Sequence, residues 1–118
     1  MIGLGRATRI YLAAGATDLR KGFDGLAALA RQVLEVDPLS GHLCLFCNLS
    51  RTRIKVIYFD GSGLWICSKR LEKGRFSWPS TQEGSRKVSL TAEELALLLG
   101  GMELERVRRK DWWRREAA

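Results

Sequence analysis

The stretch 51–79, RTRIKVIYFDGSGLWICSKRLEKGRFSWP, most constrains how this 118-residue chain can fold. Two runs of β-branched and aromatic residues flank Asp60-Gly61-Ser62-Gly63, which predicts two antiparallel strands joined by a tight turn. Successive side chains of a strand point to opposite faces of the sheet. With Gly61-Ser62 as a two-residue loop, one face is therefore basic and the other apolar. The basic face carries Arg53, Lys55 and Arg70, and the apolar face carries Ile54, Val56, Tyr58, Trp65 and Cys67.

The same stretch holds most of the excess positive charge. It contains seven Lys or Arg residues and two acids, so it supplies five of the chain's net charge of +7. Clustered positive charge is typical of proteins that contact phosphates, which makes DNA the first candidate partner. The alternative is a solvated strand face that only aids solubility. The candidate nucleic-acid-binding residues are Arg51, Arg53, Lys55, Lys69, Arg70, Lys73 and Arg75.

Local patterns predict a single α+β domain over residues 1–105. Apolar residues recur at spacings of three and four in the first predicted helix. Thr91 and Glu94 form the capping box of the second. We expect a mainly antiparallel sheet with the first helix on one face and the second at an edge or on the same face. The elements are a strand near 9–14, a helix near 20–34, an antiparallel meander over 43–71, and a helix near 92–102.

Three shorter segments complete the prediction. Residues 75–78 and 86–90 are expected to form short strands, the second of them at an edge of the sheet. Residues 106–118 form a basic C-terminal tail that contains Trp112 and Trp113. These indoles could stack on bases, dock on a partner protein or pack on the chain's own core.

No pattern for catalysis, for a metal or for a cofactor emerges. Asp18 and Asp24 could converge on a metal ion, but capping and surface roles explain them more simply. Cys44 and Cys47 lie three apart in a predicted strand, so their thiols face opposite ways and cannot easily share a metal. An odd count of three cysteines in apolar runs fits a reducing cytosol. No stretch approaches the ~20 apolar residues of a membrane span. We predict a cytoplasmic protein that is not an enzyme.

Three blocks of sequence carry a family resemblance. They are RIYLAAGATDLRKGFDGL at 9–26, the stretch from DPLSGH at 37 to YFDG ending at 61, and KRLEKGRFSWP at 69–79; residues 95–101 also fit. In these blocks the chain resembles the Orf2-like accessory proteins of bacterial insertion-sequence-66 transposons. These proteins are also called TnpB, but they are not the RNA-guided nuclease of that name.

The resemblance implies an accessory protein of bacterial transposition, which acts beside a DDE-type transposase and another small transposon-encoded protein. It carries over no catalytic residue. The family usually has basic residues between positions 48 and 51, where this chain has Leu49 and Ser50. We predict a non-catalytic factor that binds DNA through the basic hairpin. The alternative is a protein-interaction module that docks on the transposase without touching DNA.

Overall fold

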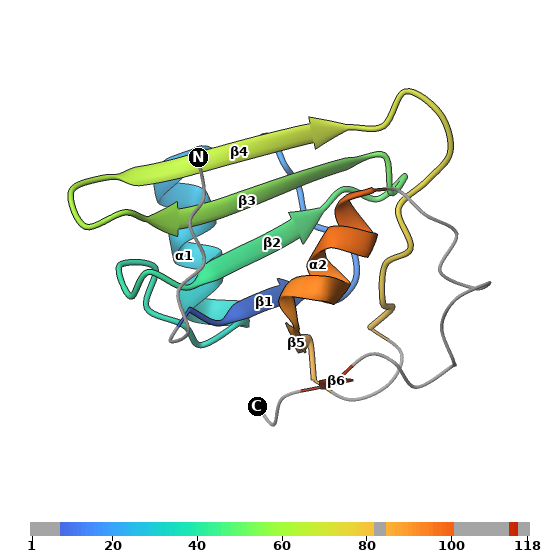
Figure 1. The fold of residues 1–118 in the computed structure, drawn as a ribbon. Coiled ribbons are helices and arrows are strands. Elements are labelled where there is room, and N and C mark those ends of the chain that lie inside the picture. The colour runs from blue at the N-terminus through green and yellow to red at the C-terminus, as the bar shows by residue number, and fades with distance from the viewer. Residues whose placement is uncertain (1–7, 82–84, 101–113, 116–118) are drawn as a thin grey trace.

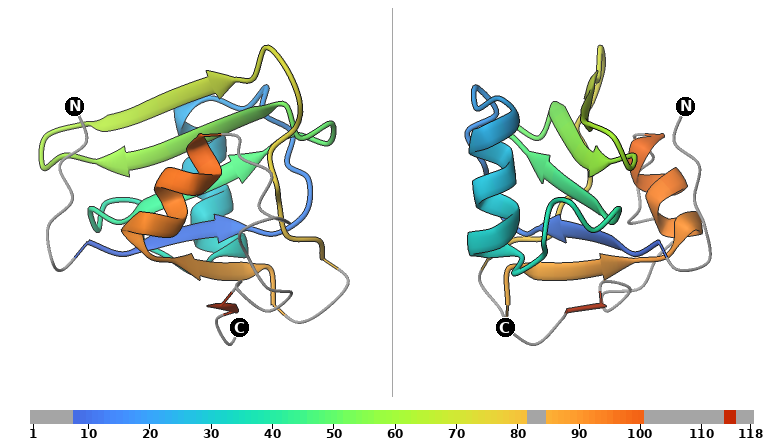
Figure 2. Two further views of the ribbon diagram at one scale, coloured as in Figure 1. Left: turned by 45° about the vertical axis from the view of Figure 1, so that its right-hand side comes forward. Right: turned by 90° about the vertical axis from the view of Figure 1, so that its left-hand side faces the viewer.

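The structure, a computed structural model, describes residues 8–81, 85–100 and 114–115. In these residues one sheet lies between two helices, as the side view of Figure 2 shows. The elements in chain order are β1 (Ile10–Ala13), α1 (Phe23–Val33), β2 (Leu43–Cys47), β3 (Arg53–Phe59), β4 (Leu64–Arg70), β5 (Lys87–Leu90), α2 (Ala92–Leu99) and β6 (Arg114–Arg115) (Figure 1).

The sheet is mainly antiparallel. Its strand order is β4-β3-β2-β1-β5-β6, and every neighbouring pair runs antiparallel except β1 and β2. A parallel pair needs a long crossover, which α1 supplies, whereas β2, β3 and β4 follow one another through short turns. The predicted α+β fold with its 43–71 meander is therefore confirmed.

Apolar side chains cover both faces of the sheet. On one face, Tyr11, Cys44, Phe46 and Ile57 pack against α1. The other face packs against α2 and against Phe76 and Trp78. Every residue of β2 is buried, because this strand has a helix-covered face on each side.

The predicted position of the second helix was wrong. The α2 helix packs on the face opposite α1, where Leu95 and Leu98 join the core formed by Ile54 and Val56. The apolar face of the hairpin is the face of the sheet opposite α1, so α1 cannot shield its side chains from water and α2 packs there instead. The predicted capping box is confirmed: Thr91 Oγ1 accepts from Glu94 N at 3.1 Å, and Glu94 Oε1 accepts from Thr91 N at 2.8 Å.

The segment 75–78 is not a strand, contrary to the prediction. Its Phe76 and Trp78 are buried in the core on the α2 side of the sheet. Trp78 Nε1 donates to Ala13 O at 2.9 Å, and Phe76 N donates to Arg51 O at 2.7 Å. The Trp78 indole N–H and the Phe76 backbone N–H are thus each satisfied by a separate hydrogen bond. The segment does not form the regular series of backbone bonds that joins two strands.

The predicted strand near 86–90 is confirmed as β5, which pairs with β1. It is not the edge strand that we expected, because β6 pairs with its other side. Apart from Arg114 and Arg115, the predicted tail with Trp112 and Trp113 lies outside the described residues, as does the domain boundary at 105. Neither described helix is long and apolar enough to cross a membrane.

Candidate nucleic-acid interface

The hairpin has the predicted register. Asp60 N donates to Gly63 O at 3.0 Å, which leaves Gly61-Ser62 as the loop. Arg53 lies opposite Arg70 and Lys55 opposite Ser68, so the three basic residues share the α1 side of the sheet. Lys69 is opposite Ile54 and thus on the α2 side, where its Nζ donates to Leu99 O at 2.6 Å. The structure therefore places Lys69 on the opposite face of the sheet from Arg53, Lys55 and Arg70.

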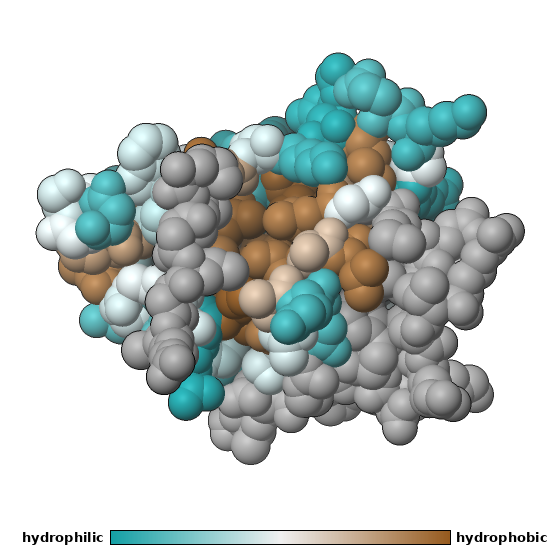
Figure 3. All heavy atoms as spheres, viewed as in Figure 1, coloured by the Kyte–Doolittle hydropathy of each residue, from teal (hydrophilic) through white to brown (hydrophobic). Residues whose placement is uncertain are grey.

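All seven candidate residues lie at the end of the hairpin far from its tight turn. Leu71 N donates to Thr52 O at 2.8 Å, and Phe76 N donates to Arg51 O. These bonds hold the 71–76 segment, with Lys73 and Arg75, beside the turn that carries Arg51. Figure 3 shows hydrophilic side chains gathered where β4 leaves the sheet, and hydrophobic ones beside α2. One end of the sheet is therefore strongly basic.

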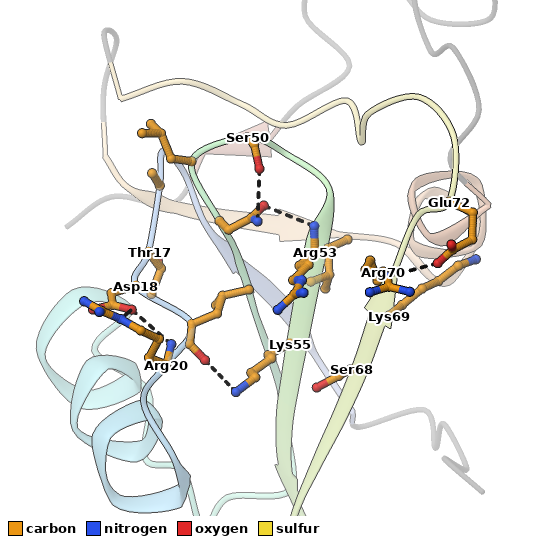
Figure 4. Close-up of a pocket in the computed structure, with 15 residues that line it drawn as sticks. Thr17, Asp18, Arg20, Ser50, Arg53, Lys55, Ser68, Lys69, Arg70 and Glu72 are labelled. Carbon is orange, nitrogen blue, oxygen red and sulfur yellow. Dashed lines mark hydrogen bonds and ion pairs between the residues drawn. The ribbon is translucent and has the colours of Figure 1, made fainter.

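An open groove of about 1370 Å³ lies on the α1 side of this basic end (Figure 4). Its walls are the segment 16–20, the turn at 48–50 and the ends of β3 and β4. Five basic side chains and two carboxylates line it, which leaves a net charge of +3. They are Lys69, from the α2 side, and Arg20, Arg53, Lys55, Arg70, Asp18 and Glu72.

Four of the five cations have partners within the protein, among them Lys69 with its bond to Leu99 O. Arg20 binds Asp18 through two nitrogens, with Nε–Oδ1 at 3.0 Å and Nη2–Oδ2 at 2.9 Å. These hydrogen bonds hold the pKa of Asp18 well below its usual range. Arg70 Nε donates to Glu72 Oε2 at 3.0 Å. Lys55 Nζ donates to Leu19 O at 2.5 Å and so ties the 16–20 wall to β3.

Arg53 is the exception. Its side chain is exposed, and within the described residues its guanidinium has no hydrogen-bond or ion-pair partner. Arg53 also lies directly opposite a second arginine, Arg70, on the same face of the strand pair. Like charges opposite each other destabilise a sheet, and an anion between them would remove that cost. Arg53 is thus the cation of the groove best placed to receive a phosphate.

Asn48 fixes the turn that presents Arg53. Its Oδ1 accepts from Thr52 N at 2.9 Å and from Arg53 N at 3.1 Å. Its Nδ2 donates to Ser50 Oγ at 3.2 Å. Arg51 within this turn has a φ of 61°, which is uncommon for a residue other than glycine and is supported by its bond from N to Asn48 O. The turn is therefore held in one shape.

The sequence reasoning missed Asp18, Arg20 and Asn48 as parts of this site. The first two lie inside the 9–26 block that carries the family resemblance, and that was the available signal. The turn with Leu49 and Ser50 lines the groove although it lacks the basic residues that the resemblance leads one to expect. Leu49 is 84% exposed there.

The two cysteines of the C-x-x-C lie in separate cores. Cys44 packs on the α1 side and Cys47 on the α2 side, as strand alternation predicts. Burial raises the pKa of each thiol to about 12, so both stay protonated at neutral pH. Within the described residues no group of three or more His, Cys, Asp or Glu side chains could hold a metal ion.

Comparison with known proteins identifies one matching family and two similar proteins. The sequence model of the family described as IS66 Orf2 like protein matches residues 8–109. An uncharacterized protein of Sinorhizobium fredii, y4hO, is 39% identical over 103 residues, which cover 87% of this chain and 88% of that protein. Another from the same organism, y4jC, is 38% identical over 110 residues, which cover 93% and 92%. No solved structure matches the chain.

Proposed function

The chain belongs to the IS66 Orf2-like family, and from that premise we propose that it is a non-catalytic accessory factor of transposition that binds duplex DNA. The binding surface is the basic end of the hairpin, with the groove on the α1 side at its centre. The factor would act in the bacterial cytoplasm during recombination of the mobile element, beside the transposase and another small protein of the transposon.

The observation that carries the proposal is Arg53, which lies opposite Arg70 and whose guanidinium has no partner in the described part of the chain. Arginine presents planar, paired donors that match phosphate oxygens, and such charge-assisted bonds are stronger than neutral ones. A phosphate between the two guanidinium groups would screen their repulsion. Arg51, Lys73 and Arg75 at the same end would then contact phosphates further along the backbone.

The arrangement of Asp18 supports a role without catalysis. Both of its carboxylate oxygens accept hydrogen bonds from Arg20, so they are engaged with a cation of the protein. A nuclease site of the two-metal type would need such carboxylates to converge on metal ions instead.

Fluorescence anisotropy of a labelled duplex at several salt concentrations tests the proposal. Each neutralised phosphate adds about −0.9 to the slope of log affinity against log salt. We expect a steep slope that Arg53→Gln makes shallower by about one phosphate. The matched control is Arg31→Gln, which removes the same charge from an exposed position of α1 outside the groove. Salt-independent binding, or equal effects of the two variants, would contradict the proposal.

A second candidate function rests on the apolar surface beside α2. Cys67, Leu71, Leu97 and Leu99 are only partly buried there, where Figure 3 shows hydrophobic side chains. Such a surface is typical of a docking site for another protein, here the transposase of the same element. Capture of the purified transposase by this protein at high salt, with loss on Leu97→Glu and no detectable DNA binding, would favour this function over the first.

A further inference from the structure

The outer side of β4 is an open sheet edge. Within the described residues β4 pairs with β3 alone and ends the strand order. Two bonds fix the alternation along the pair: Asp60 N to Gly63 O at one end and Leu71 N to Thr52 O at the other. Trp65, Cys67 and Lys69 therefore direct their backbone groups toward β3. The backbone N–H and C=O groups of Leu64, Ile66, Ser68 and Arg70 point outward from the sheet.

In its own sequence and register, β4 lacks the usual protection of an edge strand at its centre. Native edge strands are commonly short, bulged or charged along their length, so that other strands do not add to them. The seven-residue β4 pairs with β3 without a break in register, and its charges, Lys69 and Arg70, are confined to one end. Its central residues Ile66, Cys67 and Ser68 are uncharged. The edge is thus suited to pairing with another strand.

We infer that two copies of the chain pair through their β4 edges, antiparallel and centred on Cys67. Leu64 of each copy then lies opposite Arg70 of the other, and Ile66 lies opposite Ser68. The outward N–H and C=O groups of these four residues meet their counterparts across the two-fold axis. The two sheets become one continuous sheet.

The charges at the two ends of β4 favour antiparallel pairing of two copies. The basic end of β4 carries Lys69 and Arg70, whereas the other end carries Trp65 and leads to Asp60. Trp65 is 50% exposed, and its Nε1 donates to Asp60 Oδ2 at 2.6 Å. Parallel pairing would place the two basic ends together, while antiparallel pairing places each beside the carboxylate and indole of the other copy.

The faces also match. Trp65, Cys67 and Lys69 lie on the same side of the strand, so Lys69 of one copy comes beside Trp65 of the other. One face of the Trp65 ring stacks on Tyr58, with centroids 6.2 Å apart and planes 8° apart. An ammonium against its other face would make a cation–π contact. The Lys69 ammonium has three donors and gives one to Leu99 O, so it can make both contacts.

The pairing would bring the two grooves onto one surface. Residues 64, 66, 68 and 70 share the α1 side of β4, and antiparallel addition keeps that side continuous across both copies. Self-association does not depend on DNA binding, and it is measured in the absence of DNA. The failure of one proposal therefore leaves the other standing.

Analytical ultracentrifugation provides the first test. We expect a species of twice the 13.3 kDa chain mass for the wild type. Ser68→Pro removes an outward N–H and leaves the bonds to β3 intact, so it should sediment as a monomer with an unchanged circular dichroism spectrum. Ser68→Ala keeps the N–H and should remain a dimer. Lys69→Glu places like charges together and should raise the dimer dissociation constant about tenfold, which keeps the test decisive if Ser68→Pro does not fold.

Disulfide cross-linking tests the register. Facing residues of a non-hydrogen-bonded antiparallel pair have Cα atoms about 4.5 Å apart, within the range of a disulfide. Oxidation with diamide should therefore link the two Cys67 thiols, because Cys44 and Cys47 are buried. The link should vanish in Cys67→Ser and stay absent in the double variant Cys67→Ser/Ile66→Cys, whose thiol does not face its copy. A monomeric wild type, or equal cross-linking from position 66, would overturn the inference.

Discussion

Arg53 and Arg70 face each other across β3 and β4, but among the residues that the structure describes only Arg70 has a carboxylate partner, Glu72. Arg70 is thus held by an ion pair, whereas the guanidinium of Arg53 has no such pair in the described ranges. A cross-strand pair of like charges is unfavourable by a few tenths of a kcal/mol up to about 1 kcal/mol. The site therefore keeps a small electrostatic cost that binding of an anion would relieve.

Arg53→Gln should consequently stabilise the free protein and weaken DNA binding. We expect the free energy of unfolding to rise by up to about 0.5 kcal/mol, because the repulsion from Arg70 is lost. Urea denaturation followed by tryptophan fluorescence measures this change. Arg70→Gln is the control: it relieves the same repulsion but breaks the Glu72 pair, so its net effect on stability should be smaller. A destabilised Arg53→Gln protein would show that this guanidinium has a structural role.

Lys55 should behave in the opposite way. Its ammonium holds the carbonyl of Leu19 and is 3.4 Å from that of Lys21, so it joins the 16–20 wall of the groove to β3. Lys55→Met keeps the aliphatic stem and should lower the free energy of unfolding by about 1 kcal/mol, since the bond is only partly shielded from water. Urea denaturation of both variants gives the comparison. If Lys55→Met unfolds at the same urea concentration as the wild type, the ammonium does not stabilise the groove wall.

The sequence predicts local features of this molecule better than its long-range ones. The turn at Asp60–Gly63 and the alternation of residues 53–59 were enough to define the hairpin and its two faces, because both signals are local. The side on which α2 packs depends on which apolar face is still uncovered after α1 docks. That depends on a core shared by residues far apart in the sequence, such as Ile54 and Leu95.

The groove, too, was predicted from the sequence only in its local features. Its basic strand residues could be identified, but their partners could not. Lys55 donates to the carbonyl of Leu19, 36 residues away in the sequence, and Lys69 donates to that of Leu99, 30 residues away. The side chains of Lys55, Lys69 and Arg70 have hydrogen-bond partners, whereas within the described residues those of the other four candidates have none. Those four are Arg51, Arg53, Lys73 and Arg75. Sequence spacing alone treats the seven as equivalent.

Asp60 should make stability depend on pH in the acid range. Hydrogen bonds from Trp65 Nε1 and from the backbone of Ser62 and Gly63 keep the pKa of this carboxyl well below its ordinary value. Its contribution is then fully present above the unfolded-state pKa of about 4 and is lost as pH falls toward the lower folded-state pKa. Asp60→Asn should thus be less stable than the wild type at pH 7, with a smaller gap at pH 3. Urea midpoints at both pH values measure the gap, and an equal gap would rule out the ionised carboxylate as the cause.

Trp78 should be a main anchor of the segment between β4 and β5. It is 5% exposed, belongs to the core on the α2 side, and donates from Nε1 to Ala13 O at 2.9 Å. Trp78→Phe retains an aromatic ring but loses the donor, so the buried carbonyl of Ala13 is left without this bond. The expected cost is about 2–3 kcal/mol, from the unsatisfied carbonyl and the smaller ring together. Trp65→Phe is the matched control, because Trp65 is half-exposed and its partner Asp60 can turn to water. Urea denaturation should show a clearly larger loss for Trp78→Phe, and similar losses would mean that the segment is not anchored through this bond.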